Sequence, residues 1–261
     1  MERDRRILFE GIANARDLGG IRAADGRRIR RGMLLRTGNL SAATEADRKQ
    51  LQEPWKLSLV VDLRTSNGRR RKPDAKIPGV MYRGVPVFEE EMLGISHGGM
   101  GENFVFAGQP LPKMEKLYRN IVLDPGCMAQ LEKALYILMT HDFSAGSALW
   151  HCSEGKDRCG MVAAFLLTAL GADPDTIMED YLISNETGAP KAQGYYDLFL
   201  AEGRGQEAAE AVRDAFLVKE SYLRAAFDAV SEKYGSVGAY LTEGLKVPET
   251  LIREFREKVL E

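Results

Sequence analysis

The feature that most constrains this chain is a short polar loop set between two apolar runs. Residues 147–151 before the loop are mostly apolar and end in a histidine, and residues 161–170 after it carry no charge. We interpret the two runs as a buried strand and a buried helix. A strand, a tight loop and a helix in this order direct several backbone N–H groups and a helix N-terminus at one point, which can bind an anion. The loop therefore predicts an α/β fold with an anion site at the end of a strand.

The residues of this loop indicate what such a site does. Cys152 is followed six residues later by Arg158, and Gly155 between them lets the backbone turn where a Cβ would obstruct it. A helix N-terminus lowers the pKa of a nearby thiol, and the thiolate is the nucleophilic form of cysteine. Neither Cys127 nor Cys159 has an arginine at this spacing. An activated thiolate in a phosphate-sized loop predicts a phosphatase that forms a phosphocysteine. The alternative is a buried structural cysteine at the end of a core strand.

Length and composition bound the class of protein. The 261 residues, 44% hydrophobic and 28% charged, fit a single globular domain over residues 1–261. A net charge of −2 gives no reason to expect nucleic acid or membrane attraction, and three cysteines do not make a disulfide framework. The charged N-terminus does not resemble a secretory signal, and no apolar run is long enough to span a membrane. We expect a cytoplasmic protein, with signal-independent secretion left open and the oligomeric state undetermined.

A second strand is predicted to reach the same site. Residues 57–64 form a short apolar, β-branched run that ends in charge, as a buried parallel strand does. Open α/β sheets place their sites at the C-terminal ends of their strands. Asp62 and Arg64 are therefore candidates for the cleft.

The rest of the chain is predicted to be mostly helical. Residues 66–80 are basic and contain prolines, and we expect an exposed loop there. The stretch 89–118 is predicted to hold a lid, because it begins rich in Gly and Met with little periodicity. Amphipathic spacing beyond Gly171 predicts a helical C-terminal layer, 172–261, packed on the same core. Further helices are expected over 41–52 (capped by Ser41 or Thr44), 127–141 and 157–170.

Several blocks of the sequence resemble those of a known family. They are the loop His-Cys-x-x-Gly-Lys-Asp-Arg at 151–158 and the segments 14–20, 35–40, 61–64, 181–185, 222–223 and 234–236. They resemble the atypical bacterial protein-tyrosine phosphatases that also act on phosphoinositides, whose familiar members are secreted phosphatases of mycobacteria and Listeria. The resemblance covers nearly the whole chain. It implies a cysteine-phosphatase-like, mostly parallel central sheet flanked by helices. It also implies phosphotyrosine hydrolysis, with phosphoserine, phosphothreonine and phosphoinositides as further candidate substrates.

Roles within the loop follow from its chemistry and from the resemblance. Cys152 is expected to attack phosphorus in line, and Arg158 to bind two equatorial oxygens and stabilise the transition state. His151 is expected to orient the loop by hydrogen bonding, or else to be an inert structural histidine. The N–H groups expected to complete the phosphate site belong to Ser153, Glu154, Gly155, Lys156, Asp157 and Arg158.

A leaving oxygen has to be protonated, and three aspartates are candidates for the acid. Asp157 is the first choice, because the family resembled here has an aspartate inside the loop. Its alternative role is to cap the following helix. Asp62 is the second choice, and Asp124, in a turn, is the third.

Four further residues are given supporting roles by the resemblance. A loop lysine such as Lys156 suggests substrates with more than one phosphate, and the alternative is a solvent-facing lysine that raises the local potential. Asn14, Arg16 and Asp17 match a family motif and are expected to buttress the loop, with Arg16 near the substrate. We expect no cofactor and no metal, because phosphocysteine chemistry needs none and the histidines show no ligand spacing with carboxylates.

One residue departs from the family pattern. Thr or Ser usually follows the loop arginine, whereas this chain has Cys159. A thiol is the poorer hydrogen-bond partner, so fast breakdown of the phosphoenzyme is in doubt. Cys159 could form a reversible disulfide with Cys152, or could be a tolerated small residue. This doubt leaves a catalytically impaired phosphate-binding module as one alternative function. A phosphoinositide-preferring lipid phosphatase, which Lys156 suggests, is the other. A sulfurtransferase is disfavoured by the arginine that closes the loop.

Overall fold

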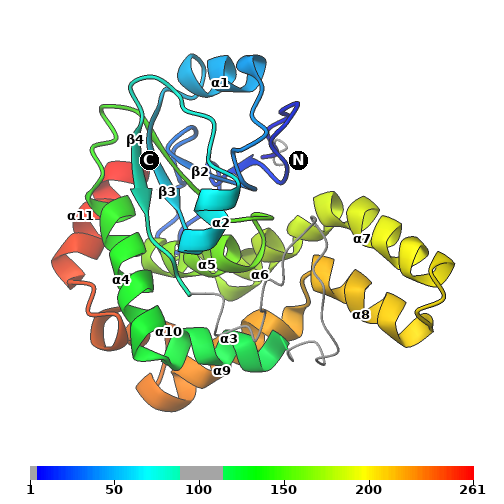
Figure 1. The fold of residues 1–261 in the computed structure, drawn as a ribbon. Coiled ribbons are helices and arrows are strands. Elements are labelled where there is room, and N and C mark those ends of the chain that lie inside the picture. Colours follow the sequence, from blue (N-terminus) through cyan, green and yellow to red (C-terminus); the bar gives the residue numbers. More distant parts are fainter. Residues whose placement is uncertain (1–4, 89–113) are drawn as a thin grey trace.

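A five-stranded sheet lies at the centre of the protein (Figure 1). The structure, a computed structural model, describes residues 5–88 and 114–261. The strand order is β1-β2-β5-β3-β4, with only the β1–β2 pair antiparallel, so the predicted mostly parallel sheet is confirmed. The strands are β1 (Arg16–Asp17), β2 (Leu34–Thr37), β3 (Leu57–Asp62), β4 (Met81–Gly84) and β5 (Ser147–His151).

The central strand β5 positions the loop. All of its residues are buried, and its last residue, His151, lies in register with Thr37 of β2 and Asp62 of β3. The carboxyl ends of three parallel strands thus meet at one edge of the sheet, where α/β proteins place their sites. The loop that follows His151 begins at this edge.

Helices cover both faces of the sheet (Figure 1). Alternate residues of a strand point to opposite faces, so Val61 and Trp150 join the larger core cluster while Val60 and Leu149 join the smaller one. The helices are α1 (Glu45–Gln52), α2 (Ser66–Arg71), α3 (Met114–Leu123), α4 (Pro125–Thr140), α5 (Asp157–Leu170), α6 (Pro174–Leu182), α7 (Ser184–Ala201), α8 (Gln206–Phe216), α9 (Glu220–Tyr234), α10 (Val237–Ala239) with a π-helical turn (Tyr240–Gly244), and α11 (Glu249–Val259).

Helix α5 has the bounds that the sequence predicted. Its residues from Cys159 to Leu170 are nearly all buried, as expected for an apolar run between the sheet and other helices. Gly171 ends it in the left-handed conformation, with φ of 81°. No helix among the described residues is long and apolar enough to cross a membrane.

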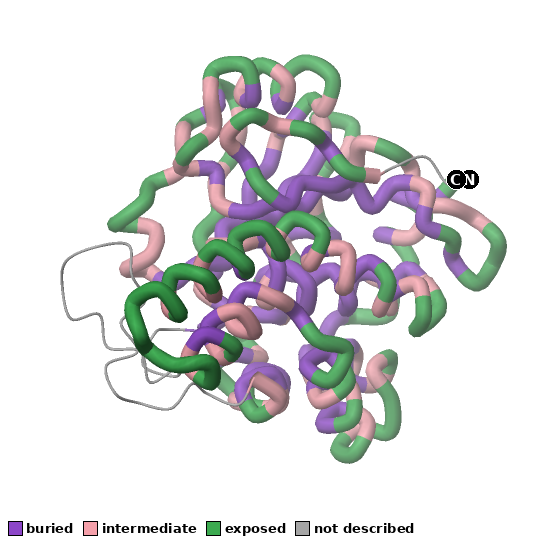
Figure 2. The backbone as a smooth tube through the Cα atoms, turned by 90° about the vertical axis from the view of Figure 1, so that its right-hand side faces the viewer, coloured by how far each residue is buried: buried purple, intermediate pink, exposed green. Residues whose placement is uncertain are grey.

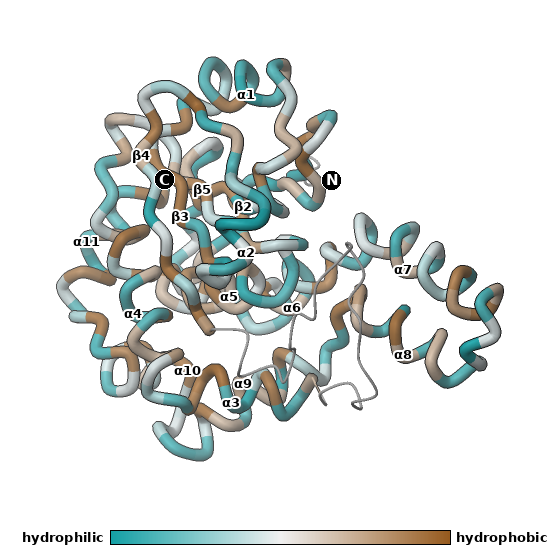
Figure 3. Tube along the Cα trace, in the orientation of Figure 1, coloured by the Kyte–Doolittle hydropathy of each residue, from teal (hydrophilic) through white to brown (hydrophobic). Residues whose placement is uncertain are grey.

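Three expectations about the elements need correction. Residues 66–71 are helix α2 rather than loop, because Thr65 caps the turn by accepting a 2.9 Å hydrogen bond from the N–H of Gly68. The helix is hydrophilic along its length (Figure 3). Residues 114–118 of the expected lid belong to α3, which packs on α9, and the rest of that segment lies outside the described residues. The helix expected over 127–141 is α4, which begins at Pro125 because Asp124 caps it by accepting a hydrogen bond from the N–H of Cys127.

The helical C-terminal layer divides into two parts. Helices α6, α9 and α11 contribute to the main core, as predicted. Helices α7 and α8 instead form a projecting hairpin with a small core of its own, in which Tyr195 stacks on Phe216 at 4.5 Å between ring centroids. Most of α7 is exposed (Figure 2). The expectation of one continuous layer on the main core is therefore wrong for this hairpin.

Candidate active site

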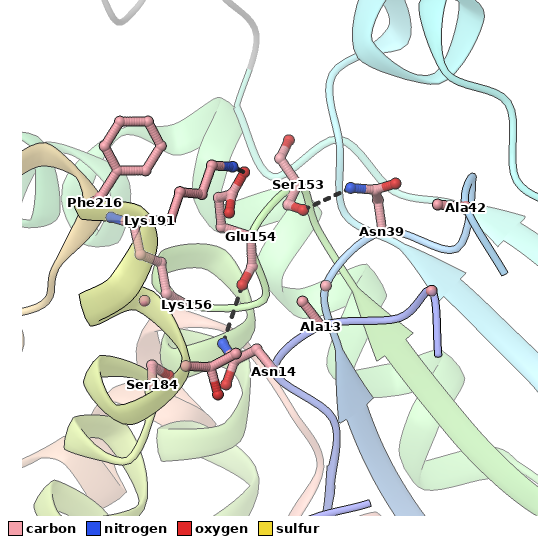
Figure 4. A pocket seen from close by; sticks show the side chains of 14 residues that line it. Ala13, Asn14, Asn39, Ala42, Ser153, Glu154, Lys156, Ser184, Lys191 and Phe216 are labelled. Atoms are coloured by element: carbon pink, nitrogen blue, oxygen red, sulfur yellow. Dashed lines mark hydrogen bonds and ion pairs between the residues drawn. The ribbon is translucent and has the colours of Figure 1, made fainter. Parts of the chain in front are cut away.

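The loop between β5 and α5 is held in place by side chains of other elements, which donate hydrogen bonds to its carbonyl oxygens. Three successive carbonyl oxygens accept hydrogen bonds from outside the loop. That of Ser153 accepts from Asn39 at 2.9 Å and that of Glu154 from Asn14 at 3.0 Å (Figure 4). That of Gly155 accepts from Arg36 at 2.9 Å. Peptide bonds in the described part of the chain are trans, so each N–H points away from the carbonyl before it. With the carbonyls fixed outward, the N–H groups of residues 154–156 are directed into the loop, as an anion site requires.

Gly155 is required by the space behind the loop as well as by its backbone angle. Its φ is 70°, in the left-handed region. A Cβ at this position would lie 2.6 Å from the carbonyl carbon and oxygen of Thr37. The loop therefore packs directly against the end of β2, and only glycine fits there.

The motif at 14–17 buttresses the loop, but not in every way that was expected. Asn14 contacts the loop, and Arg16 donates a 2.8 Å hydrogen bond to the Asn14 side-chain oxygen and so orients it. Arg16 is 1% exposed and ion-paired with Asp180, so the expectation of Arg16 near the substrate is wrong. The Asp17 carboxylate accepts hydrogen bonds from the N–H groups of Gly19 and Gly32, so it stabilises a turn rather than the loop.

A buried charge cluster behind the loop was missed by the sequence analysis. Asp180 of α6 accepts hydrogen bonds from Arg5, Arg16 and Arg36, and Arg36 also holds the loop carbonyl of Gly155. Although burial acts in the opposite direction, the arginine charges hold the pKa of Asp180 well below its usual range. The sequence offered one signal, Arg36 directly after the apolar pair Leu34 and Leu35, because Asp180 lies in a segment that also contains Asp175 and Glu179.

Cys152 is poised as a thiolate. It is 2% exposed, and its pKa is lowered to about 5, first by a hydrogen bond from the Cys159 thiol and, against the effect of burial, by the charge of Arg158. Burial and the neighbouring thiolate raise the pKa of Cys159 well above its usual range, so Cys159 keeps its proton and can donate it. The Cys159 thiol also donates to the carbonyl oxygen of Thr37 at 3.7 Å, so its single proton is shared between this oxygen and the Cys152 sulfur. All three cysteines are free thiols, so the suggested disulfide stays a hypothesis.

Arg158 lies at the mouth of the loop and is partly exposed. Its guanidinium donates hydrogen bonds of 3.3 Å to the Ser153 hydroxyl and to the carbonyl of Leu63. The face of the guanidinium lies 4.7 Å from the centre of the Phe88 ring. These contacts leave a planar cation beside the N–H groups, in position for a bound phosphoryl group.

Lys156 is buried, so the solvent-facing alternative is wrong, whereas its role toward substrates with more than one phosphate stays a prediction. It is 6% exposed, and its ammonium group lies 2.8 Å from Asp157 Oδ2 and 3.4 Å from the carbonyl oxygen of Leu217 at the end of α8. The charge is thus paired inside the protein rather than presented to solvent. The Asp157 side chain is 24% exposed, and its other oxygen accepts a hydrogen bond from Tyr118.

His151 belongs to a second buried network at the edge of the sheet. Its Nε2 atom lies 3.0 Å from Asp74, and its Nδ1 atom lies 3.3 Å from the carbonyl oxygen of Cys152. Arg64 donates to both Asp62, at 2.6 Å, and Asp74, at 2.8 Å. The fold therefore brings a histidine and two carboxylates within reach of one point, against the sequence-based expectation. The guanidinium already bridges the two carboxylates, so the cluster contains its own cation.

A pocket of about 180 Å³ opens between the loop and the hairpin (Figure 4). Glu154 extends across it to Lys191 of α7, with 2.7 Å between the charged groups. Its walls also include the Asn14 and Asn39 amides, the hydroxyls of Ser184 and Thr187, and the Phe216 ring. The pocket therefore combines polar side chains with an apolar surface of glycines, two alanines and Phe216, and it lies beside the nucleophile, because neither Cys152 nor Arg158 lines it.

Together these elements form a low-pKa cysteine inside an anion-binding loop, at the carboxyl edge of a parallel sheet. Such an arrangement defines cysteine-based phosphoryl chemistry. Residues 7–261 match the model of the tyrosine phosphatase family, and the chain belongs to this family. It is thus a phosphoric monoester hydrolase of the tyrosine phosphatase type.

Two relatives with similar sequences agree with this assignment, and one solved structure aligns with the chain. A protein of Cupriavidus necator assigned to the tyrosine-protein phosphatases is 34% identical over 254 residues, 95% of this chain and 86% of its own length. The triple specificity protein phosphatase PtpB of Mycobacterium tuberculosis is 28% identical over 89% of this chain and 91% of its own. The solved catalytic core of Siw14 aligns with 89% of this chain and 96% of its own, at 14% identity and a TM-score of 0.36.

Proposed function

We propose that this protein hydrolyses phosphotyrosine through a phosphocysteine on Cys152, and that phosphoserine, phosphothreonine and phosphoinositides are further substrates. The single observation that carries the proposal is the pKa of Cys152, about 5, inside a loop whose N–H groups point inward. The wider substrate range is supported by the similarity to a relative named for triple specificity. In this proposal the partner is a phosphorylated protein, or a phosphoinositide, and the protein acts in the cytoplasm.

In the first step, the Cys152 sulfur attacks phosphorus and the bond to the leaving oxygen breaks. Arg158 and the loop N–H groups bind the non-bridging oxygens and stabilise their charge in the transition state. Asp157, when protonated, gives its proton to the leaving oxygen. Asp62 is less suited to this role, because its carboxylate oxygens accept hydrogen bonds from Arg64 and the residue is 5% exposed.

In the second step, water attacks the phosphocysteine, Asp157 takes a proton from it, and phosphate leaves. The leaving group is now the Cys152 thiolate, and Cys159 donates its hydrogen bond to it. A hydrogen-bonded thiolate is a better leaving group than a bare one, so a thiol at this position supports turnover. This contact favours an active enzyme over a binding module.

The test is phosphate release by the wild-type protein and by Cys152→Ser, on a phosphotyrosine peptide and on phosphatidylinositol phosphates, in the presence of a chelator. We expect release by the wild type only, and the ratio between the substrates then ranks protein against lipid. Release by both proteins would refute the cysteine mechanism. Release by neither, with the peptide still bound, would identify a phosphate-binding module.

A further inference from the structure

A chain of buried hydroxyl groups ends on Asp157. The Tyr118 hydroxyl donates a 2.7 Å hydrogen bond to Asp157 Oδ1 and lies 2.8 Å from the Tyr181 hydroxyl. A phenol has one proton. Since Tyr118 gives its proton to the carboxylate, the second contact has to be donated by Tyr181. The direction of the chain is therefore Tyr181 to Tyr118 to Asp157.

Both tyrosines are placed by packing rather than by solvent. Tyr118 is fully buried and Tyr181 is 1% exposed, and their rings meet edge to face with centroids 6.3 Å apart. Tyr118 comes from α3 and Tyr181 from α6, while Tyr222 of α9 packs against Tyr118 at 5.8 Å. Packing among α3, α6 and α9 thus fixes the Tyr118 hydroxyl where it donates a hydrogen bond to Asp157.

The two oxygens of Asp157 have different partners. Oδ1 accepts from Tyr118, and Oδ2 lies 2.8 Å from the Lys156 ammonium group. With both contacts in place, the carboxyl group cannot rotate about its terminal torsion without losing one of them. Lys156 is a flexible side chain, whereas the Tyr118 ring is fully buried in the core. The hydrogen bond from Tyr118 is therefore the contact that fixes the orientation of the Asp157 carboxyl group.

We infer that Tyr118, supported by Tyr181, is a positioning residue that aims the Asp157 carboxyl at the leaving oxygen. The inference rests on the proposed function, in which Asp157 is the general acid. Burial raises the pKa of Tyr118 well above its usual range, so the phenol keeps its proton and orients the carboxyl without replacing it as the acid.

The test compares Tyr118→Phe with the wild type on two aryl phosphates, one with a good leaving group (p-nitrophenyl phosphate) and one with a poor one (phenyl phosphate). A good leaving group needs little protonation. A general acid contributes roughly 10²- to 10⁴-fold. We therefore expect kcat/KM, which reports the first step, to fall on the order of tenfold for phenyl phosphate and about twofold or less for p-nitrophenyl phosphate. Tyr222→Phe is the matched control, because it removes a phenol beside Tyr118 that is not part of the chain.

A double-mutant cycle with Asp157→Asn makes the test specific. If Tyr118 acts through Asp157, adding Tyr118→Phe to Asp157→Asn causes no further loss. Equal slowing of both substrates by Tyr118→Phe, or an additive loss in the cycle, would overturn the inference. If Tyr118→Phe does not fold, judged by its circular dichroism, Tyr181→Phe replaces it, with a smaller effect of the same selectivity expected. Failure of the cysteine mechanism is detected separately, as activity retained by Cys152→Ser.

Discussion

The catalytic loop and the α7–α8 hairpin lie on either side of one pocket and are stabilised in opposite ways. The loop is fixed by buried donors from several elements, and its strand and helix belong to the main core. The hairpin has a small core of its own and presents Leu198 and Leu200 to solvent at 45% and 42% exposure. Its links to the loop are the Lys191–Glu154 pair and the Leu217 carbonyl near Lys156. The difference implies that the anion site is rigid, whereas the wall beside it can move at little cost.

The largest effect is expected from Asp180→Asn. This change keeps the shape of the side chain but removes the carboxylate that pairs with Arg5, Arg16 and Arg36. Breaking a buried ion pair by neutralising one partner costs about 3–5 kcal/mol. Urea unfolding measures the loss in free energy of unfolding. Asp175→Asn, at an exposed position of the same helix, is the control, and equal stability of the two variants would show that the cluster does not hold the loop.

The next prediction compares two glycines with nearly the same backbone angle. Gly155 in the loop has a φ of 70° and Gly203 in the hairpin turn a φ of 68°, yet a Cβ meets nothing within 4 Å at Gly203. Alanine at either site should cost about 1–2 kcal/mol for the left-handed angle. Gly155→Ala adds a clash with Thr37 and should lose activity, whereas Gly203→Ala should keep it. Comparable activity of the two variants would contradict the close packing behind the loop.

A smaller effect is expected for the hydrogen bond to the nucleophile. The folded pKa of Cys152, about 5, lies below the ordinary thiol value, so the thiolate is present at neutral pH and is lost as the pH falls through 5. Cys159→Ala should move this midpoint upward, because the largest cause of the low pKa is removed, while Cys159→Ser should keep most of it. Thiolate absorbance at 240 nm measures the titration of Cys152. Cys127 does not contribute in this pH range, because burial raises its pKa to about 12. An unchanged midpoint in Cys159→Ala would assign the low pKa to Arg158 and the loop alone.

The smallest effect is expected in the hairpin. Lys191→Ala removes a partly exposed ion pair with Glu154 and a contact with the Phe216 ring. Exposed pairs contribute about 1 kcal/mol or less, so thermal unfolding should change little. The KM for a charged phosphopeptide is the second measurement, and it changes only if the peptide reaches the pocket that Lys191 lines. A large loss of stability would show that the hairpin is fixed to the loop as firmly as the core is.

Local patterns predicted much of the fold. The apolar runs at 57–64 and 147–151 gave strands, and Gly171 ended its helix where expected, because these signals depend on a few neighbouring residues. The hairpin was not separated from the core, since amphipathic spacing shows that a helix has an apolar face but not which partner covers it. Helix α2 was missed because its stability comes from one capping hydroxyl and not from an apolar face.

The candidate site was predicted where one continuous loop carries the chemistry. Cys152, Arg158 and Cys159 are brought together by their spacing in one loop. The low pKa of the Cys152 thiol follows first from the hydrogen bond of Cys159 and then from the charge of Arg158. Arg36, Asp180 and Tyr118 come from three distant elements, and only the strand order and the helix packing place them beside the loop. The sequence could not show that Lys156 is buried and paired with Asp157, so a solvent-facing lysine was left open as an alternative.

The position of β5 has a consequence for how the protein is made. Strand β5 is the last strand in the sequence, yet it lies between β2 and β3, which do not pair with each other. During synthesis the pairs β1–β2 and β3–β4 remain separate, each with an unpaired edge, until residue 151 has emerged. Arg16 and Arg36 can form their ion pairs only later, when Asp180 has been made. Open edges of this kind invite pairing with other chains. The nascent protein therefore passes through an interval in which the edges of β2 and β3 are unpaired, and the catalytic loop can form only after β5 has paired with both.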